Sequence, residues 1–474
     1  MCAVTLVTDA GIRATILAGE VTAFRQTKLY GAGRRLAAAV KGKAMTIIYR
    51  VFLPFAAGLY LSFLFRVINA LIAPRLGLDL GIGTAGLGTM TSIFFLAFAA
   101  SQLVVGGLLD RYGPRRVQSA LMLIGAAGVA LFATGQNLWA LTAARALMAL
   151  GFSASLASGV KAIVSWLPRE RISLANGWML ALGSLGAVSA TGPSNLLMHA
   201  LGWRGLLDVL AVLTLAVSAL IYVIVPDARP DSAAARNNLS MPLPKIIANR
   251  DFLRVAPLTS LAVSVPWAMQ GLWATPWLRD VAGYDHLTIV SVLFVMGCTL
   301  CGGGVLLGSA ADRLHTRGIS TEAVFGAAVL ALLTIEALIL VHAPLPAYLL
   351  WGALSLFGSL PALGFAIMSE LFAKNVMGRI SSAFVMLNFA TAFVVQSGMG
   401  YILALWPATA GGHSPSVAYE AAFAAPYLLQ IAAFCWFLWA TSRQRASATA
   451  PSFRAVAIAA EPERPLPIRD IRPS

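Results

Sequence analysis

Four charged side chains lie inside long apolar segments of the chain: Arg66, Arg145, Asp208 and Glu336. By insertion scales, each such charge costs about 2.5 to 3.5 kcal/mol at the centre of a bilayer, and it is normally kept for function. An arginine without an acidic partner attracts an anion, because its planar guanidinium matches a carboxylate or phosphate with two parallel hydrogen bonds. If either arginine faces a cavity, the chemistry that it offers is therefore the binding of an anion.

The segments that hold these charges must lie in lipid. Of the 474 residues, 59% are hydrophobic and 11% are charged, whereas a soluble globular chain carries roughly a quarter charged residues. Uncharged windows such as 80–109, 172–203 and 380–419 exceed the roughly 20 residues with which a helix crosses about 30 Å of hydrocarbon. No run alternates polar and apolar residues with a period of two, so we expect an all-α polytopic membrane protein and exclude a β-barrel.

The hydropathy pattern predicts twelve transmembrane helices. We place them at residues 51–73, 85–109, 117–135, 138–160, 173–198, 203–225, 254–279, 288–311, 319–341, 345–370, 379–404 and 418–441. Such boundaries carry errors of about three residues.

The net charge of +15 is explained by the placement of the basic residues in loops. The loops after even-numbered spans hold fifteen lysines and arginines, whereas those after odd-numbered spans hold only Arg75, Arg204 and Arg279. The positive-inside rule then puts both termini in the cytoplasm, and we expect a bacterial plasma membrane protein. This topology accounts for the basic excess, so we expect no nucleic-acid partner.

The polar stretches divide the chain into five parts. Residues 1–44 are basic and lack a cleavable signal, which predicts a cytoplasmic leader, although Met45 is an alternative start. The polar stretch 226–253 reads as a cytoplasmic linker between six-helix bundles at 45–225 and 254–442, and 443–474 as a cytoplasmic tail.

The four cysteines predict neither a disulfide framework nor a cofactor site. Cys298 and Cys301 form a C-x-x-C pair inside an apolar segment with no carboxylate or histidine beside it. Close packing of small residues explains this pair better than metal or redox chemistry does. We therefore expect no metal and no cofactor.

Two short motifs recur across the linker, each in equivalent loops of the two halves. The first is G-x-x-x-D-R, at Gly106, Asp110 and Arg111 and again 202 residues later at Gly308, Asp312 and Arg313. The second is R-I-S, at 171–173 and 379–381. The loop from Gly106 to Arg116, GGLLDRYGPRR, resembles the hallmark motif G-x-x-x-D-R-x-G-R-[RK] of the major facilitator superfamily, departing from it at Pro114.

This resemblance covers roughly residues 50–442 and implies two pseudo-symmetric bundles of six helices that rock around a central site. In the family, the loop motif holds the cytoplasmic side shut in the outward-facing state. The resemblance thus implies a gating latch, which comprises Gly106, Asp110, Arg111, Gly113, Arg115, Arg116, Gly308, Asp312 and Arg313. The alternative is that these charges only anchor their loops in water.

In this fold, spans one, four, seven and ten line the cavity. The resemblance therefore implies that Arg66 in span one and Arg145 in span four face the cavity, whereas Asp208 in span six and Glu336 in span nine are peripheral. The candidate substrate-binding residues are Arg66, Asn69, Arg145, Gln270 and Asn388. For Arg66 the alternative is that it extends toward the lipid headgroups, and for Arg145 it is helix packing or proton relay. The run from Arg66 to Pro74 resembles organic-anion symporters of the superfamily, although Phe65 stands where those proteins carry an aspartate.

The resemblance and the charges together predict a secondary transporter that moves a small solute, an organic anion, by alternating access. The rival is a proton-coupled efflux pump for apolar or cationic compounds. A membrane-embedded enzyme is disfavoured because no paired acids, H-E-x-x-H or serine with a base is present. We expect no catalytic residues and a monomer. The sequence leaves open whether the protein is instead a receptor that kept the fold. It also leaves open the coupling ion, the direction of transport and the identity of the solute.

Overall fold

The computed structural model describes residues 48–167, 169–227, 243–373, 376–407 and 414–449, and every regular element in them is a helix. The predicted leader at 1–44, the linker residues 228–242 and the tail beyond residue 449 lie outside the described residues.

The first half of the described chain contains eight helical elements. They are η1 (Ile48–Phe52), α2 (Leu53–Val67), α3 (Asn69–Leu80), α4 (Thr84–Thr134), α5 (Leu138–Phe152), α6 (Ser155–Trp166), α7 (Arg169–Ser189) and α8 (Gly192–Ile224).

The second half contains eleven. They are α9 (Leu243–Ile247), α10 (Arg250–Ala268), η2 (Met269–Trp273), α11 (Ala274–Asp280), α12 (His286–His315), α13 (Thr321–Leu340), α14 (Ala347–Leu356), η3 (Phe357–Ser359), α15 (Pro361–Leu371), α16 (Met377–Leu403) and α17 (Ser416–Thr449).

Ten helices of the described chain are long and apolar enough to cross a membrane. The longest of them, α4, breaks at Gly113, where φ is 78° and ψ is 162°, and α8 breaks at Gly202 with a φ of 73°. A residue with a side chain rarely adopts such a backbone. Pro114 follows Gly113 at the start of the next helical segment, a position where its missing N–H group costs nothing. These two breaks fall between predicted spans two and three and between spans five and six, and the count of twelve crossings stays a prediction.

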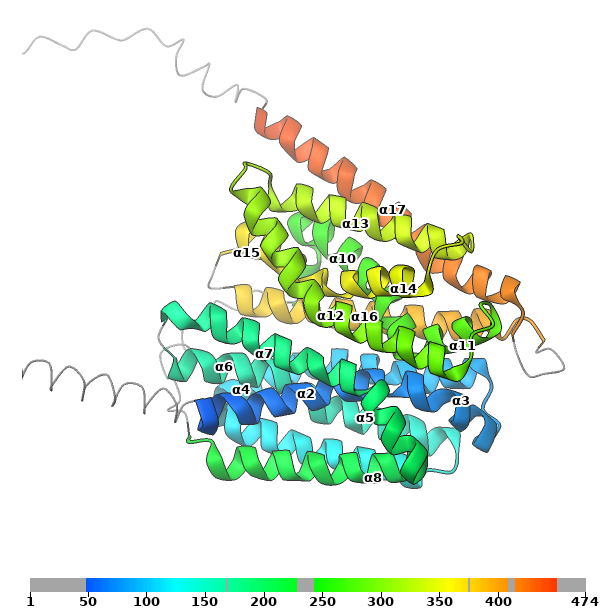
Figure 1. Cartoon of the computed structure of the whole chain (residues 1–474). Coiled ribbons are helices and arrows are strands. Elements are labelled where there is room, and N and C mark those ends of the chain that lie inside the picture. Colours follow the sequence, from blue (N-terminus) through cyan, green and yellow to red (C-terminus); the bar gives the residue numbers. More distant parts are fainter. Residues whose placement is uncertain (1–47, 168, 228–242, 374–375, 408–413, 450–474) are drawn as a thin grey trace, which may run out of the picture.

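The buried apolar side chains form two large clusters. One consists mainly of residues of the first half, joined by Val263, Trp267, Val290, Leu300, Phe389 and Ala392 of the second half. The other consists of residues of the second half together with Ala73. In Figure 1 the two groups of helices lie side by side with their axes roughly parallel. The first described helix begins and the last one ends at the same end of the molecule, on the left of Figure 1.

Predicted spans one, four, seven and ten are each interrupted partway along their length. Span one divides into α2 and α3 at Ile68, and span four divides into α5 and α6 at Ser153 and Ala154. Span seven contains the π-helical turn η2, and span ten contains the short 3-10 turn η3. Such interruptions release backbone carbonyls from the helical ladder, and within a membrane they persist where protein or a water-filled cavity satisfies those groups.

Candidate functional site

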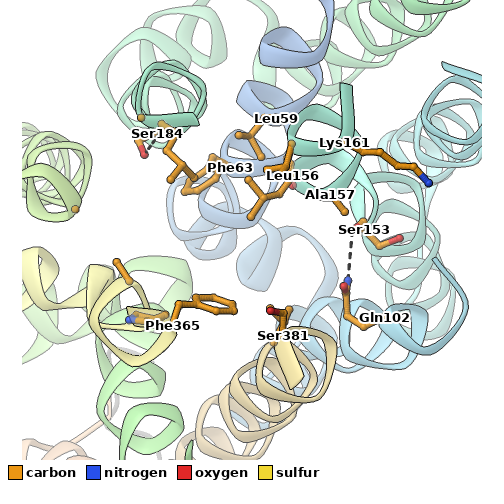
Figure 2. Close-up of a pocket in the computed structure, with 18 of the residues that line it drawn as sticks. Leu59, Phe63, Gln102, Ser153, Leu156, Ala157, Lys161, Ser184, Phe365 and Ser381 are labelled. Carbon is orange, nitrogen blue, oxygen red and sulfur yellow. Dashed lines mark hydrogen bonds between the residues drawn. The ribbon is translucent and has the colours of Figure 1, made fainter. Parts of the chain in front are cut away.

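A cavity of about 1770 Å³ lies between the two halves. In the first half its walls come from α2, α4, α6 and α7, and in the second half from α10, α12, η3, α15 and α16. Figure 2 shows Phe63 and Leu156 of the first half facing the same space as Phe365 and Ser381 of the second half. None of the described lining residues belongs to α13 or α17, which places these two helices behind the wall.

The cavity opens toward one end of the molecule, which we call the basic end because it carries the lysine-rich and arginine-rich loops. Its mouth is lined by the loop from Asp110 to Gly113, by Lys161, by Asp312 and by Gly378. Its deep part is lined by Arg66, Trp267, Asn388 and Phe389, among others. Of these, Arg66 and Trp267 lie close in sequence to the interruptions in α2/α3 and in α10/η2.

The opposite end is sealed by close contacts between the two halves. A Cβ atom built on Gly88 of α4 would lie 3.1 Å from the Cα atom of Gly400 of α16 and 3.1 Å from the ring of Trp273. Only residues without a side chain allow these two helices to approach so closely.

Hydrogen bonds between the halves add to this seal. Thr275 Oγ1 donates to the carbonyl of Ala70 at 2.9 Å, and His286 Nε2 lies 3.1 Å from Asn195 Oδ1. The described structure is therefore open at the basic end and closed at the other.

Arg66 projects from α2 into the deep part of the cavity. Its guanidinium carbon lies 4.5 Å from the ring centroid of Phe63 and 4.8 Å from that of Trp267, which belongs to the other half. Among the described residues, no carboxylate and no hydrogen-bond acceptor pairs with its N–H groups. The aromatic rings contact the flat faces of the guanidinium, so the N–H groups along its edges stay available for hydrogen bonds to a ligand.

Asn388 of α16 also lies in the cavity wall. Its Oδ1 accepts a hydrogen bond of 2.7 Å from Ser260 Oγ. Its Nδ2 has no acceptor in the part of the chain that the structure describes. The structure therefore brings Arg66 and Asn388, one from each half, to the same cavity.

The other three candidate substrate-binding residues do not line the cavity. Arg145 is buried behind α2, where its Nη1 donates to the carbonyl of Phe65 at 2.9 Å, close to the break between α2 and α3. Asn69 donates to Thr91 Oγ1, and Gln270 Nε2 donates to Ser355 Oγ at 3.3 Å. Most of these polar groups therefore bond to one another or to the interrupted backbone. The Nε of Arg145 has no hydrogen-bond partner among the described residues, and its guanidinium carbon lies 4.9 Å from the ring centroid of Phe94.

The two acids inside predicted spans also lie away from the cavity, in agreement with the expectation that they are peripheral. Glu336 of α13 is fully buried, and its Oε2 accepts a 2.9 Å hydrogen bond from Gln430 Nε2 of α17. Asp208 is exposed on the outside of α8. The acids that do line the described cavity, Asp110, Asp227 and Asp312, all lie at its mouth.

The candidate latch residues gather around the mouth, and their ion pairs differ between the halves. Asp110 Oδ1 lies 2.7 Å from Lys161 Nζ within the first half, and Asp227 pairs with Arg115 at 3.2 Å and with Arg116 at 3.5 Å. Of the remaining candidates, Arg111, Gly113, Gly308 and Asp312 line the cavity, whereas Gly106 and Arg313 do not. In the part of the chain that the structure describes, Asp312 has no ion pair.

Four phenylalanines in the cavity wall are functional candidates that the sequence did not lead us to name. They are Phe63 of α2, Phe94 and Phe98 of α4 and Phe389 of α16. Phe63 precedes Arg66 by three residues, and Phe94 precedes Phe98 by four. This spacing places each pair on one helix face, a signal that was present in the sequence.

The two cysteines of the C-x-x-C pair lie in different surroundings. Cys301 lies in the cavity wall and directs its Sγ to the carbonyl of Ala181 at 3.6 Å, while Cys298 is exposed. Among the described residues, no group of three or more His, Cys, Asp or Glu side chains is placed to hold a metal ion.

Two bundles around a cavity that is open at one end and sealed at the other define the class of polytopic membrane transporters. The sequence model of the Major Facilitator Superfamily matches residues 55–396, and the chain belongs to this family. Family membership places the chain among transporters rather than among the membrane-embedded enzymes.

Individual relatives are distant. A probable sulfoacetate transporter of Cupriavidus necator is 23% identical over 54% of this chain and 63% of its own length. A multidrug resistance protein of Serratia proteamaculans is 29% identical over 49% of this chain and 55% of its own length. The chain thus spans less than two-thirds of the length of these two curated relatives.

The fold matches a solved structure closely. A bacterial homologue of the human lysosomal transporter Spinster, in an inward-facing and unoccupied conformation, superposes with a TM-score of 0.69 at 13% identity. The superposition covers 85% of this chain and 99% of that chain.

Proposed function

We propose that this protein carries a small organic anion across the bacterial plasma membrane by alternating access, and that Arg66 receives the anion. The observation that carries the proposal is the charge distribution of the cavity. In its described deep part the lining holds one cation, Arg66, and no carboxylate. A cation in such a place is stabilised by an anionic partner, which the described part of the protein does not itself supply.

The position of Arg66 between the two halves supports a role in coupling binding to movement. Its guanidinium stacks on Trp267 of the second half, while its own backbone belongs to α2 of the first half. An anion held by Arg66 would therefore touch the surface along which the halves move. A ligand shifts a conformational equilibrium only by binding the two states differently, and a site shared by both halves provides that difference.

We take the basic end as cytoplasmic, by the positive-inside rule, so the described conformation is the inward-open one. The alternate conformation then requires that the seal near Gly88 and Gly400 opens and that the mouth near Asp110 closes. Asp312 is the acid without an ion pair at the described mouth, and closure would bring it toward the basic groups of the first half.

The multidrug relative and the many apolar lining residues favour one rival function, the efflux of apolar or cationic compounds. A cation would need an acid in the deep cavity to offset its desolvation. Since the described acids lie at the mouth, this function has less support from the charges.

A thermal-shift screen of the purified protein against carboxylates, phosphates and organic cations tests the proposal, because only true ligands stabilise the folded state. We expect a carboxylate to raise the melting temperature of the wild type but not of Arg66→Ala. The matched control is Arg317→Ala, which removes the same charge from an exposed site outside the cavity and should respond as the wild type does. Stabilisation by organic cations alone would refute the anion proposal and favour efflux.

A further inference from the structure

Aromatic rings form a continuous wall beside the guanidinium of Arg66. The ring of Trp267 lies 5.1 Å from that of Phe389, and Phe389 stacks on Phe98 at 4.1 Å with an interplanar angle of 10°. Phe94 extends the wall, with its centroid 6.3 Å from that of Phe98. Each of these four residues lines the cavity, so a ligand on Arg66 would lie beside aromatic side chains.

Hydrogen-bonding groups are scarce at the same depth. The polar side chains that line this part of the cavity include Ser62, Ser359 and Asn388. Ser359 Oγ already donates to the carbonyl of Leu300 at 3.2 Å, and Asn388 Oδ1 already accepts from Ser260. A sugar acid carries one carboxylate and several hydroxyls, and each hydroxyl withdrawn from water without a partner costs binding energy. A site of this kind therefore penalises hydroxyl-rich anions.

The charges at this depth also favour one negative group over two. Arg66 is the deep cation, whereas Arg111, Arg116 and Lys161 of the described lining lie at the mouth. Lys161 is held there by its ion pair with Asp110. The guanidinium carbon of Arg145 lies 4.9 Å from the ring centroid of Phe94, but Arg145 is buried outside the cavity. A second carboxylate beside the aromatic wall would thus be desolvated without a cation to bind.

We propose that the substrate class is an aromatic monocarboxylate, whose carboxylate binds the edge of Arg66 and whose ring packs on Phe98 and Phe389. This inference rests on the proposed function, because it names the kind of organic anion that the same site takes. Offset-stacked or edge-to-face contacts between the ligand ring and these phenylalanine rings add to the binding free energy that comes from burying apolar area. The carboxylate supplies the paired hydrogen bonds that the guanidinium lacks.

Calorimetric titration of the purified full-length protein with four small probes tests this proposal. Benzoate carries both ring and charge, cyclohexanecarboxylate keeps the charge and shape, benzamide keeps the ring, and gluconate is a sugar acid. We expect benzoate to bind at least about tenfold more tightly than benzamide or gluconate. Arg66→Ala should abolish benzoate binding, and Arg317→Ala should leave it unchanged.

Phe389→Leu separates aromatic recognition from simple apolar burial. Leucine keeps much of the apolar volume but removes the π-face, so we expect benzoate affinity to fall by about two- to tenfold. Cyclohexanecarboxylate affinity should stay within about twofold of the wild-type value, which also shows that the variant is folded.

The outcomes distinguish this inference from the proposed function on which it rests. If gluconate binds as tightly as benzoate and needs Arg66, the aromatic class is wrong while the organic-anion function stands. An equal loss of benzoate and cyclohexanecarboxylate affinity in Phe389→Leu likewise refutes ring recognition. If no carboxylate binds, or if binding survives Arg66→Ala, both the inference and the proposed function are wrong.

Discussion

Gln396 of α16 is fully buried at the sealed end, and neither its Oε1 nor its Nε2 has a hydrogen-bond partner in the described structure. Its backbone carbonyl accepts a 3.0 Å hydrogen bond from the indole of Trp273, and a Cβ on Gly271 would lie 3.6 Å from its Oε1. The same Cβ would lie 3.7 Å from the carbonyl of Arg66 in the first half, so the amide is enclosed where the two halves meet. Sealing this end buries a polar group without compensation, which disfavours the sealed state.

The variant Gln396→Leu removes that penalty, because leucine has a similar size and no polar atoms. An unsatisfied buried donor or acceptor costs about 1 to 3 kcal/mol. In the opposite conformation we expect water to reach the amide, so the penalty acts on the sealed state alone. The variant should therefore shift the equilibrium toward the sealed, inward-open state by about 5- to 150-fold.

Spin labels on the two halves measure this shift. Leu78 and Leu405 are exposed at the sealed end of the first and second halves, so labels at these positions, in a background without the native cysteines, report the opening of that end. We expect the population with the longer distance to fall in Gln396→Leu. Val394→Leu, an exposed position on the same helix, should leave the distances unchanged.

An unchanged or larger open population in Gln396→Leu would refute the reasoning that a buried, unpaired amide destabilises the seal. The same shift should also lower the transport rate. Since each transport cycle must open this end, Gln396→Leu should also slow turnover.

Three further predictions follow from single residues. Asp110→Asn loses the ion pair with Lys161, and we expect slower uptake with substrate affinity within about twofold of wild type, as for a gating contact outside the binding site; an unchanged rate would assign this motif to loop anchoring. Gly113→Ala places a side chain at a φ of 78°, which should cost about 1 to 3 kcal/mol of stability and lower the melting temperature; an unchanged melting temperature would contradict that strain. Glu336→Gln keeps a hydrogen-bonding group toward Gln430 outside the cavity, so the rate of uptake and its pH dependence should match those of the wild type. A loss of the pH dependence would show that Glu336 carries the coupling proton.

The helical architecture could be predicted from the sequence because hydropathy in lipid is a strong constraint. The apolar segments, the loop motif and its repeat at Gly308 to Arg313 sufficed to predict an all-helical fold and the family. The break in predicted span four was not predictable in the same way. Ser153 and Ala154 have no signal comparable to proline, and their departure from the helix depends on how neighbouring helices pack.

The candidate site could be predicted only in part, since the two arginines have the same side chain and different surroundings. Arg145 finds the carbonyl of Phe65, which the break after Val67 makes available, and it is therefore buried behind α2. Arg66 is one residue beyond that carbonyl and faces the cavity. The sequence shows that both charges are costly to place in lipid. Only the packing of the helices shows that Arg145 already has a hydrogen-bond partner and that Arg66 has none among the described residues.

Transport of an anion through Arg66 is most directly tested by uptake into proteoliposomes. The substrate is the labelled carboxylate that stabilises the purified protein most strongly, compared in wild type, Arg66→Ala, Arg66→Lys and Arg317→Ala. We predict that Arg66→Ala inserts but takes up none, that Arg66→Lys recovers part of the rate because lysine lacks the planar fork, and that Arg317→Ala matches wild type. Undiminished uptake by Arg66→Ala would contradict this account of the site.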